Sequence, residues 1–236
     1  MSRPLDRDPS SVVRWLALVL AVLGAGAVAQ VPPARGEIAR YQGLHAAAAR
    51  GDAAEIERLA RAGGKLDALD GGGRTPLHVA VYFKHRDATR MLLKLGADPN
   101  ALEHRRYDVV TIAAVADDLE TLRLVLAGGA SAKNTTSPYD GTALIAAAHL
   151  GHAEVVRELI RAGAPLDHVN NLGWTALIEA IVLGDGGRRH TETLRALVEA
   201  GANVNLADRR GTAPVALARG RGYTAMAQIL ERAGAR

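Results

Sequence analysis

One short phrase recurs through most of this chain at a nearly constant spacing. The phrase is cleanest at Thr75-Pro76-Leu77-His78, and altered copies place an apolar residue at the same point of successive units, at Leu44, Leu77, Val110, Leu144 and Leu177. The intervals between these residues are 33, 33, 34 and 33 residues. A fixed period of this size indicates short repeats that stack on one another and bury their apolar faces against their neighbours. It argues against a single globular core.

The composition narrows the class of protein further. Hydrophobic residues make up 48% of the 236 residues but aromatic residues only 3%, which suits close packing of thin helices better than a large globular core. Cysteine is absent, so the chain has no disulfide, no thiol nucleophile and no thiolate metal site. The net charge is +4 without a long basic run, which favours an ordinary solvated surface over nucleic-acid binding.

The N-terminal segment has the order of a secretory signal. Arg3, Arg7 and Arg14 precede an uncharged apolar run over 15–29, which ends in Ala27-Val28-Ala29. A basic start, a short apolar middle and an A-x-A site predict a signal peptide over 1–29, cleaved before Gln30, and a periplasmic or secreted protein. The alternative is an uncleaved inner-membrane anchor that retains residues 12–31 and still exports the repeats.

A short linker is predicted between this signal and the repeats. Residues 30–36 contain Pro32-Pro33 and Gly36, so we expect a stiff connection that does not start a helix.

Six repeats follow, and their motifs carry a family resemblance. Thr75-Pro76-Leu77-His78-Val79-Ala80, Leu92-Leu93 and Gly96-Ala97-Asp98-Pro99-Asn100 match the T-P-L-H-x-A, L-L and G-A-D-x-N pattern of the ankyrin repeat family, which the chain resembles over 37–236. The resemblance implies an all-α solenoid of helix-turn-helix repeats with short β-hairpin or turn fingers, which binds other proteins. We place the repeats at about 37–69, 70–102, 103–136, 137–169, 170–207 and 208–236.

Two repeats depart from the pattern. In the third, Asp108 stands where Thr75 stands in the second, so both residues are predicted to cap a helix N-terminus. In the fifth, five extra residues lie around 185–190. This insertion is either a tolerated loop extension, which we favour, or a basic contact point formed by Arg188 and Arg189.

No motif points to catalysis, a cofactor or a metal. His45, His78, His85 and His152 occupy repeated positions, so a structural role is predicted for them. Neither H-E-x-x-H spacing nor a nucleophile elbow or phosphate loop occurs. We therefore predict a non-enzymatic protein without cofactor or small-molecule substrate. The competing hypothesis is a metal protein or enzyme that uses His104, His149 and nearby acids.

Residues that differ between the copies are the candidates for partner binding. The resemblance implies that the finger tips and the exposed side of each first helix line a concave face. The repeat register shows which residues fall on this face, and we predict that they contact a partner protein of unknown identity. Trp174 is an exception with two interpretations, because it could instead pack on the next finger. The predicted partner-binding residues are Arg74, Tyr82, Phe83, Arg105, Tyr107, Tyr139, His149, Trp174, Glu179 and Arg209.

Overall fold

Each predicted repeat folds into two short helices joined by a tight turn. The computed structural model describes residues 32–236, so the predicted signal peptide over 1–29 and the alternative anchor over 12–31 both lie outside the described residues. The helix pairs are α3 (Gly43–Arg50) with α4 (Ala53–Arg61), α5 (Pro76–Tyr82) with α6 (Arg86–Lys94), α7 (Val109–Val115) with α8 (Leu119–Ala127), α9 (Ala143–His149) with α10 (Ala153–Arg161), α11 (Ala176–Val182) with α12 (Arg188–Glu199), and α13 (Pro214–Gly220) with α14 (Thr224–Arg232).

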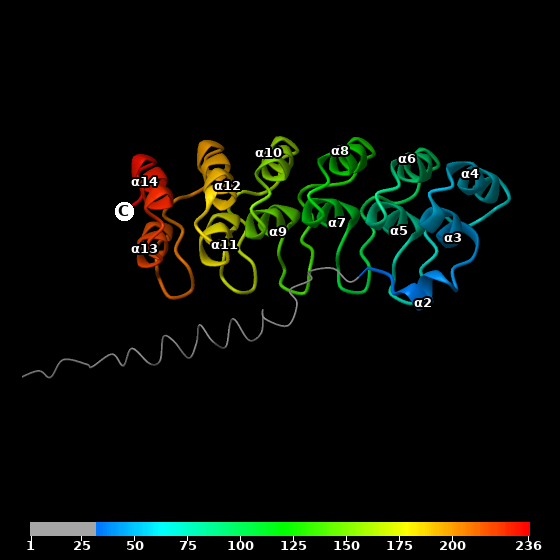
Figure 1. Cartoon of the computed structure of the whole chain (residues 1–236), viewed down its shortest axis with the longest axis horizontal. Helices are drawn as coiled ribbons and strands as arrows, with labels where there is room; N and C mark the ends of the chain where they lie inside the picture. The colour runs from blue at the N-terminus through cyan, green and yellow to red at the C-terminus, as the bar shows by residue number, and fades with distance from the viewer. Residues whose placement is uncertain (1–31) are drawn as a thin grey trace, which may run out of the picture. The chain divides into compact units, whose positions relative to one another are not determined.

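The pairs stack side by side in two layers. The first helix of each pair, here called the inner helix, packs on the inner helices of the neighbouring repeats, and the second, the outer helix, packs on outer helices. Figure 1 shows the outer helices in one row, the inner helices in a second row, and loops that project beyond the inner row. The predicted all-α solenoid of six repeats is therefore confirmed.

The repeated phrase fixes where each inner helix begins. The side-chain oxygen of Thr75 accepts a hydrogen bond from the backbone N–H of His78, and Pro76 occupies the first helical turn, where its missing N–H costs nothing. Asp108 caps α7 in the same way, through a 2.8 Å hydrogen bond from the Thr111 N–H. Both predicted caps are confirmed.

The core is a line of aliphatic side chains that runs through the stack. Leu77, Val110, Leu144 and Leu177 are all at most 1% exposed, which accounts for the constant interval between them. Burial of such a side chain contributes about 1.5–3 kcal/mol relative to leaving it in water. Alanines such as Ala80 and Ala147 are buried beside them and let adjacent inner helices approach closely.

Loops here called fingers connect each repeat to the next. They comprise residues 70–74, 103–107, 136–141, 170–174 and 208–212. The first residue of a finger donates its backbone N–H to the carbonyl of the last, as in Asp70 to Arg74 at 3.0 Å. Within residues 32–236 the fingers contain only turns and one isolated bridge between Thr136 and Gly141, and no β-strand.

Two expectations about local structure need correction. Helix α2 (Arg35–Ile38) begins inside the predicted linker, because Ala34 ends the proline segment and Glu37 accepts a 2.7 Å hydrogen bond from the Ala34 N–H. The insertion in the fifth repeat is only partly a loop. It lengthens α12 to 12 residues, whereas α10 has 9 residues.

None of the helices in residues 32–236 combines the length and the apolar character needed to cross a membrane.

Candidate functional site

The finger tips carry the exposed members of the predicted partner-binding set. Tyr139 is 46% exposed, and Arg105 and Arg209 are also exposed. Four further members are half-buried: Tyr82, Phe83, His149 and Trp174. Tyr82 and Phe83 pack partly against the hydrophobic core, so they offer one edge to solvent and not a whole ring.

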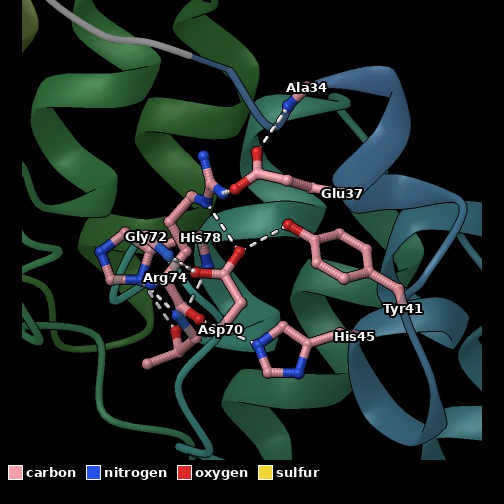
Figure 2. A network of polar contacts seen from close by, with 9 residues as sticks. Ala34, Glu37, Tyr41, His45, Asp70, Gly72, Arg74 and His78 are labelled. Atoms are coloured by element: carbon pink, nitrogen blue, oxygen red, sulfur yellow. Dashed lines mark hydrogen bonds and ion pairs between the residues drawn. The ribbon is translucent and has the colours of Figure 1, made fainter.

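Arg74 belongs to a buried polar network and is not exposed, which corrects its predicted placement. Figure 2 shows its guanidinium between two carboxylates, with Nε 2.8 Å from Asp70 and Nη2 2.9 Å from Glu37 of α2. The hydroxyl of Tyr41 donates a 2.6 Å hydrogen bond to Asp70. The network therefore ties the first finger to helix α2.

The network stays charged over a wide pH range. Burial acts to raise the pKa of Asp70, but hydrogen bonds from Tyr41, Arg74 and Gly72 outweigh it and lower that pKa to about 2. The Asp70 carboxylate and the Arg74 guanidinium are thus both ionised near neutral pH. Such a permanently paired cluster has a structural role.

Tyr107 is also buried, which corrects a second predicted contact. Only 4% of this residue is exposed, and burial raises the pKa of its hydroxyl to about 12. Its backbone carbonyl accepts the N–H of Glu103 across the finger and faces Nε2 of His78 at 3.2 Å. The backbone carbonyls of Arg74 and Tyr107, the last residues of the first two fingers, each face a histidine of the preceding repeat, which holds both residues against the stack.

Glu179 is the third predicted contact that the structure buries. It occupies the register position of Val79 and Ile112, which are fully apolar, and it is 4% exposed. Its Oε1 accepts a 2.9 Å hydrogen bond from the Asn170 side chain, and its Oε2 lies 3.4 Å from Nδ1 of His149. A carboxylate in an apolar position is costly unless it is paired.

Four exposed aliphatic residues on or beside the fingers were not predicted. Leu69, Leu102, Val169 and Leu172 are 40–62% exposed. The first three stand immediately before the first residue of their fingers, so the repeat register contained the signal that could have revealed them. Large exposed apolar side chains that lie in a row indicate an interaction surface, whereas scattered ones are common on any protein.

The repeated histidines are structural, as predicted. Each of the four uses a ring nitrogen to reach a backbone carbonyl in a neighbouring repeat: His45 at Arg74, His78 at Tyr107, His85 at Ala49 and His152 at Ala114. In the part of the chain that the structure describes, no three His, Asp or Glu side chains gather closely enough to hold a metal ion.

The insertion fastens three repeats together. Arg189 Nη2 lies 3.4 Å from Asp117 in the third repeat, and His190 Nε2 lies 2.9 Å from the His149 carbonyl in the fourth. Nδ1 of His190 also lies 2.9 Å from Asp185, which closes the insertion on itself. Arg188 and Arg189 were the two candidates for a basic partner contact, and Arg189 has an internal structural role instead.

Together the two-layer stack, the capped inner helices and the projecting fingers define a repeat protein that presents a row of loops. The family model for ankyrin repeats, which describes three copies of the repeat, matches residues 12–103 and again residues 110–208, so that it covers more than half of the chain. The chain belongs to the ankyrin repeat family. Repeats of this family generally mediate protein–protein interaction.

Several relatives are similar to this chain over most of its length. Putative ankyrin repeat protein YahD of Escherichia coli K12 is 33% identical over 190 residues, which cover 80% of this chain and 94% of that protein. An ankyrin repeat domain from Acinetobacter baumannii AYE is 44% identical, with a TM-score of 0.78 over 82% of this chain and 98% of that one. The ankyrin repeat domain of Bcl-3, an IkappaB family member, is 29% identical, with a TM-score of 0.74 over 84% of this chain and 88% of that one.

Proposed function

We propose that this protein is an exported, non-enzymatic binding module that recognises a partner protein through its fingers and the adjoining inner helices. The observation that carries the proposal is the contrast between positions. Residues that repeat, such as Leu77 and His78, are buried, whereas Arg105, Tyr139 and Arg209 differ from copy to copy and are exposed. Arginine and tyrosine are also residue types that dominate binding hot spots.

Export is supported by the sequence of the first 29 residues. The basic residues, the short apolar run and Ala27-Val28-Ala29 suit cleavage before Gln30. N-terminal sequencing of the mature protein tests this directly. A chain that begins at Gln30 supports release into the periplasm or medium, and a chain that keeps residues 12–31 supports the membrane-tethered scaffold.

Affinity capture with matched variants tests the binding surface. The finger variant combines Arg105→Ala, Tyr139→Ala and Arg209→Ala, and the control variant combines Arg61→Ala, Arg90→Ala and Arg232→Ala on exposed outer-helix positions. We expect the finger variant to lose a partner that the wild type and the control capture from the exported fraction. Equal capture by all three proteins would rule out the finger surface. Tyr107→Ala is unsuitable for this purpose, because removing a buried side chain damages the stack itself.

The competing metal or enzymatic hypothesis has a separate test. Purified protein is analysed for bound metal, together with a His149→Ala variant. We expect no stoichiometric metal. Zinc or copper that is present in the wild type and lost in the variant would contradict the proposal of a pure binding module.

A further inference from the structure

An exposed aliphatic row runs along the base of the fingers. We define this aliphatic row as Leu69, Leu102 and Val169, each of which directly precedes the first residue of a finger. Their exposed fractions are 62%, 42% and 46%. Equivalent positions of stacked repeats line up along the array, so these side chains form a line and not isolated spots. Thr135 occupies the equivalent position between Leu102 and Val169, and Ala207 occupies it after Val169, both with smaller side chains.

A second row lies at the finger tips and carries positive charge. We define this tip row as Arg105, Tyr139, Leu172, Arg209 and Arg210, all of which are exposed. Arg105, Leu172 and Arg210 are each the third residue of their finger. The arginines stand at both sides of a central apolar part formed by Tyr139 and Leu172.

The carboxylates on the fingers already have hydrogen-bond or ion-pair partners within the protein. Glu103 accepts the backbone N–H groups of Arg105 and Tyr107, and Asp208 accepts those of Arg210 and Thr212. Asp140 pairs with Arg106 at 2.7 Å.

The three tip-row arginines have no such partners. Over residues 32–236, the side chains of Arg105, Arg209 and Arg210 form neither an ion pair nor a hydrogen bond. The finger carboxylates are therefore occupied, whereas these three cations are available to a carboxylate from outside.

The spacing of the array suits an extended chain. Packed helices lie about 8–10 Å apart, so successive fingers follow each other at about that interval. A polyproline II segment advances about 9 Å per three-residue turn and presents the same face at every third residue. One side chain in three can thus meet each successive finger.

We propose, building on the finger-binding function above, that the partner contributes an extended acidic segment with an aliphatic side chain at every third residue. The aliphatic side chains lie on the aliphatic row, and carboxylates pair with Arg105 at one side and with Arg209 and Arg210 at the other. Arginine suits this role because its planar guanidinium binds a carboxylate in bidentate fashion.

Synthetic peptides with a three-residue period test this chemistry. The probe is Leu-Pro-Glu repeated once for each finger, and its matched controls are the same peptide with Lys in place of Glu and the same peptide with Ser in place of Leu. We expect the wild-type protein to bind the Leu-Pro-Glu peptide at least about tenfold more tightly than either control in fluorescence anisotropy. The affinity falls with added salt, because exposed charge pairs are screened.

Charge reversal makes the test decisive. One variant combines Arg105→Glu, Arg209→Glu and Arg210→Glu, and we expect it to bind the Lys peptide more tightly than the Glu peptide. A second variant combines Leu69→Ser, Leu102→Ser and Val169→Ser, and we expect it to lose affinity for both the Glu peptide and the Lys peptide. Because all six positions are exposed, circular dichroism should show unchanged folding. Equal binding of the Glu and Lys peptides, or no binding of either, overturns the proposal.

Three further outcomes test the acidic-segment chemistry and the finger-binding function separately. Binding to vesicles of anionic lipid or to single-stranded DNA, without discrimination between the peptides, also overturns the acidic-segment chemistry. A natural partner that the Ala finger variant loses but the charge-reversed variant retains leaves the finger function intact and refutes the charge preference. Failure of both finger variants to change capture refutes the function itself.

Discussion

Nη2 of Arg74 lies 2.9 Å from Oε1 of Glu37, which joins the first finger to the short helix that precedes all six repeats. The same guanidinium pairs with Asp70, and both side chains of that pair are 6% exposed. Helix α2 is therefore part of the folded stack, and its attachment depends on one arginine.

The first prediction concerns that attachment. Arg74→Met keeps an unbranched apolar stem but removes the guanidinium, which leaves the buried Asp70 carboxylate without its cation. Breaking a buried ion pair from one side costs about 3–5 kcal/mol, so we expect a loss of about 3 kcal/mol in the free energy of unfolding. Urea denaturation measures this loss, and hydrogen exchange should show faster exchange at residues 34–50.

The matched control is Arg61→Met, which removes an exposed helix-surface pair with Glu57. Exposed pairs contribute little, so the unfolding midpoint of this variant should stay close to that of the wild type. If Arg74→Met were no more destabilising than Arg61→Met, the network of Figure 2 would not contribute to the stability of the stack.

The second prediction is a pH dependence that arises from His78. Burial penalises the imidazolium and lowers the pKa of His78 to about 4, although its hydrogen bond to the Tyr107 carbonyl acts in the opposite direction. Nδ1 of His78 accepts the Thr75 N–H at 3.2 Å, so the neutral ring is the form that fits. The unfolded chain binds the proton near pH 6.5 and the folded chain only near pH 4, so stability falls as the pH drops between these values.

The magnitude and the control follow from that shift. A difference of about 2.5 pH units corresponds to at most about 3 kcal/mol of stability lost between pH 7 and pH 4. His78→Gln lacks the titrating group, so its unfolding free energy should change less over this range. Parallel pH profiles for the two proteins in urea denaturation would show that His78 is not the source.

The sequence predicted those features that depend on short-range chemistry. The Thr75 and Asp108 caps follow from residues three positions apart, and the buried leucines follow from the period itself. The burial of Arg74 and Tyr107 could not be predicted in this way. It depends on contacts with α2 and with a histidine 29 residues away, which a single repeat does not reveal.

The third prediction concerns the buried carboxylate of Glu179. Its Oε2 lies beside His149, which pairs with it ionically only when the imidazole is protonated. Glu179→Gln keeps an oxygen for Asn170 and places an amide, which donates a hydrogen bond, beside Nδ1 of His149. We expect this variant to be about 1 kcal/mol more stable than the wild type, because a buried carboxylate is replaced by a neutral amide.

Thermal unfolding of Glu179→Gln and of Glu179→Ala measures this effect. The Ala variant leaves the Asn170 side chain without its acceptor and should be less stable than the Gln variant. A Gln variant less stable than the wild type would mean that the carboxylate strengthens the stack.

The fourth prediction uses two glycines with the same backbone conformation. Gly73 and Gly211 both have φ +75, so alanine at either position carries the same left-handed strain of about 1–2 kcal/mol. A Cβ at Gly73 would stand 2.3 Å from Cδ2 of His104 on the next finger, whereas nothing lies within 4 Å at Gly211. Gly73→Ala should therefore cost about 1–3 kcal/mol more than Gly211→Ala in urea denaturation.

Adding His104→Ala removes the collision and should bring the cost of Gly73→Ala down to that of Gly211→Ala, because the excess belongs to the contact between fingers. An excess that persists without the His104 ring would place its origin in the Gly73 backbone instead.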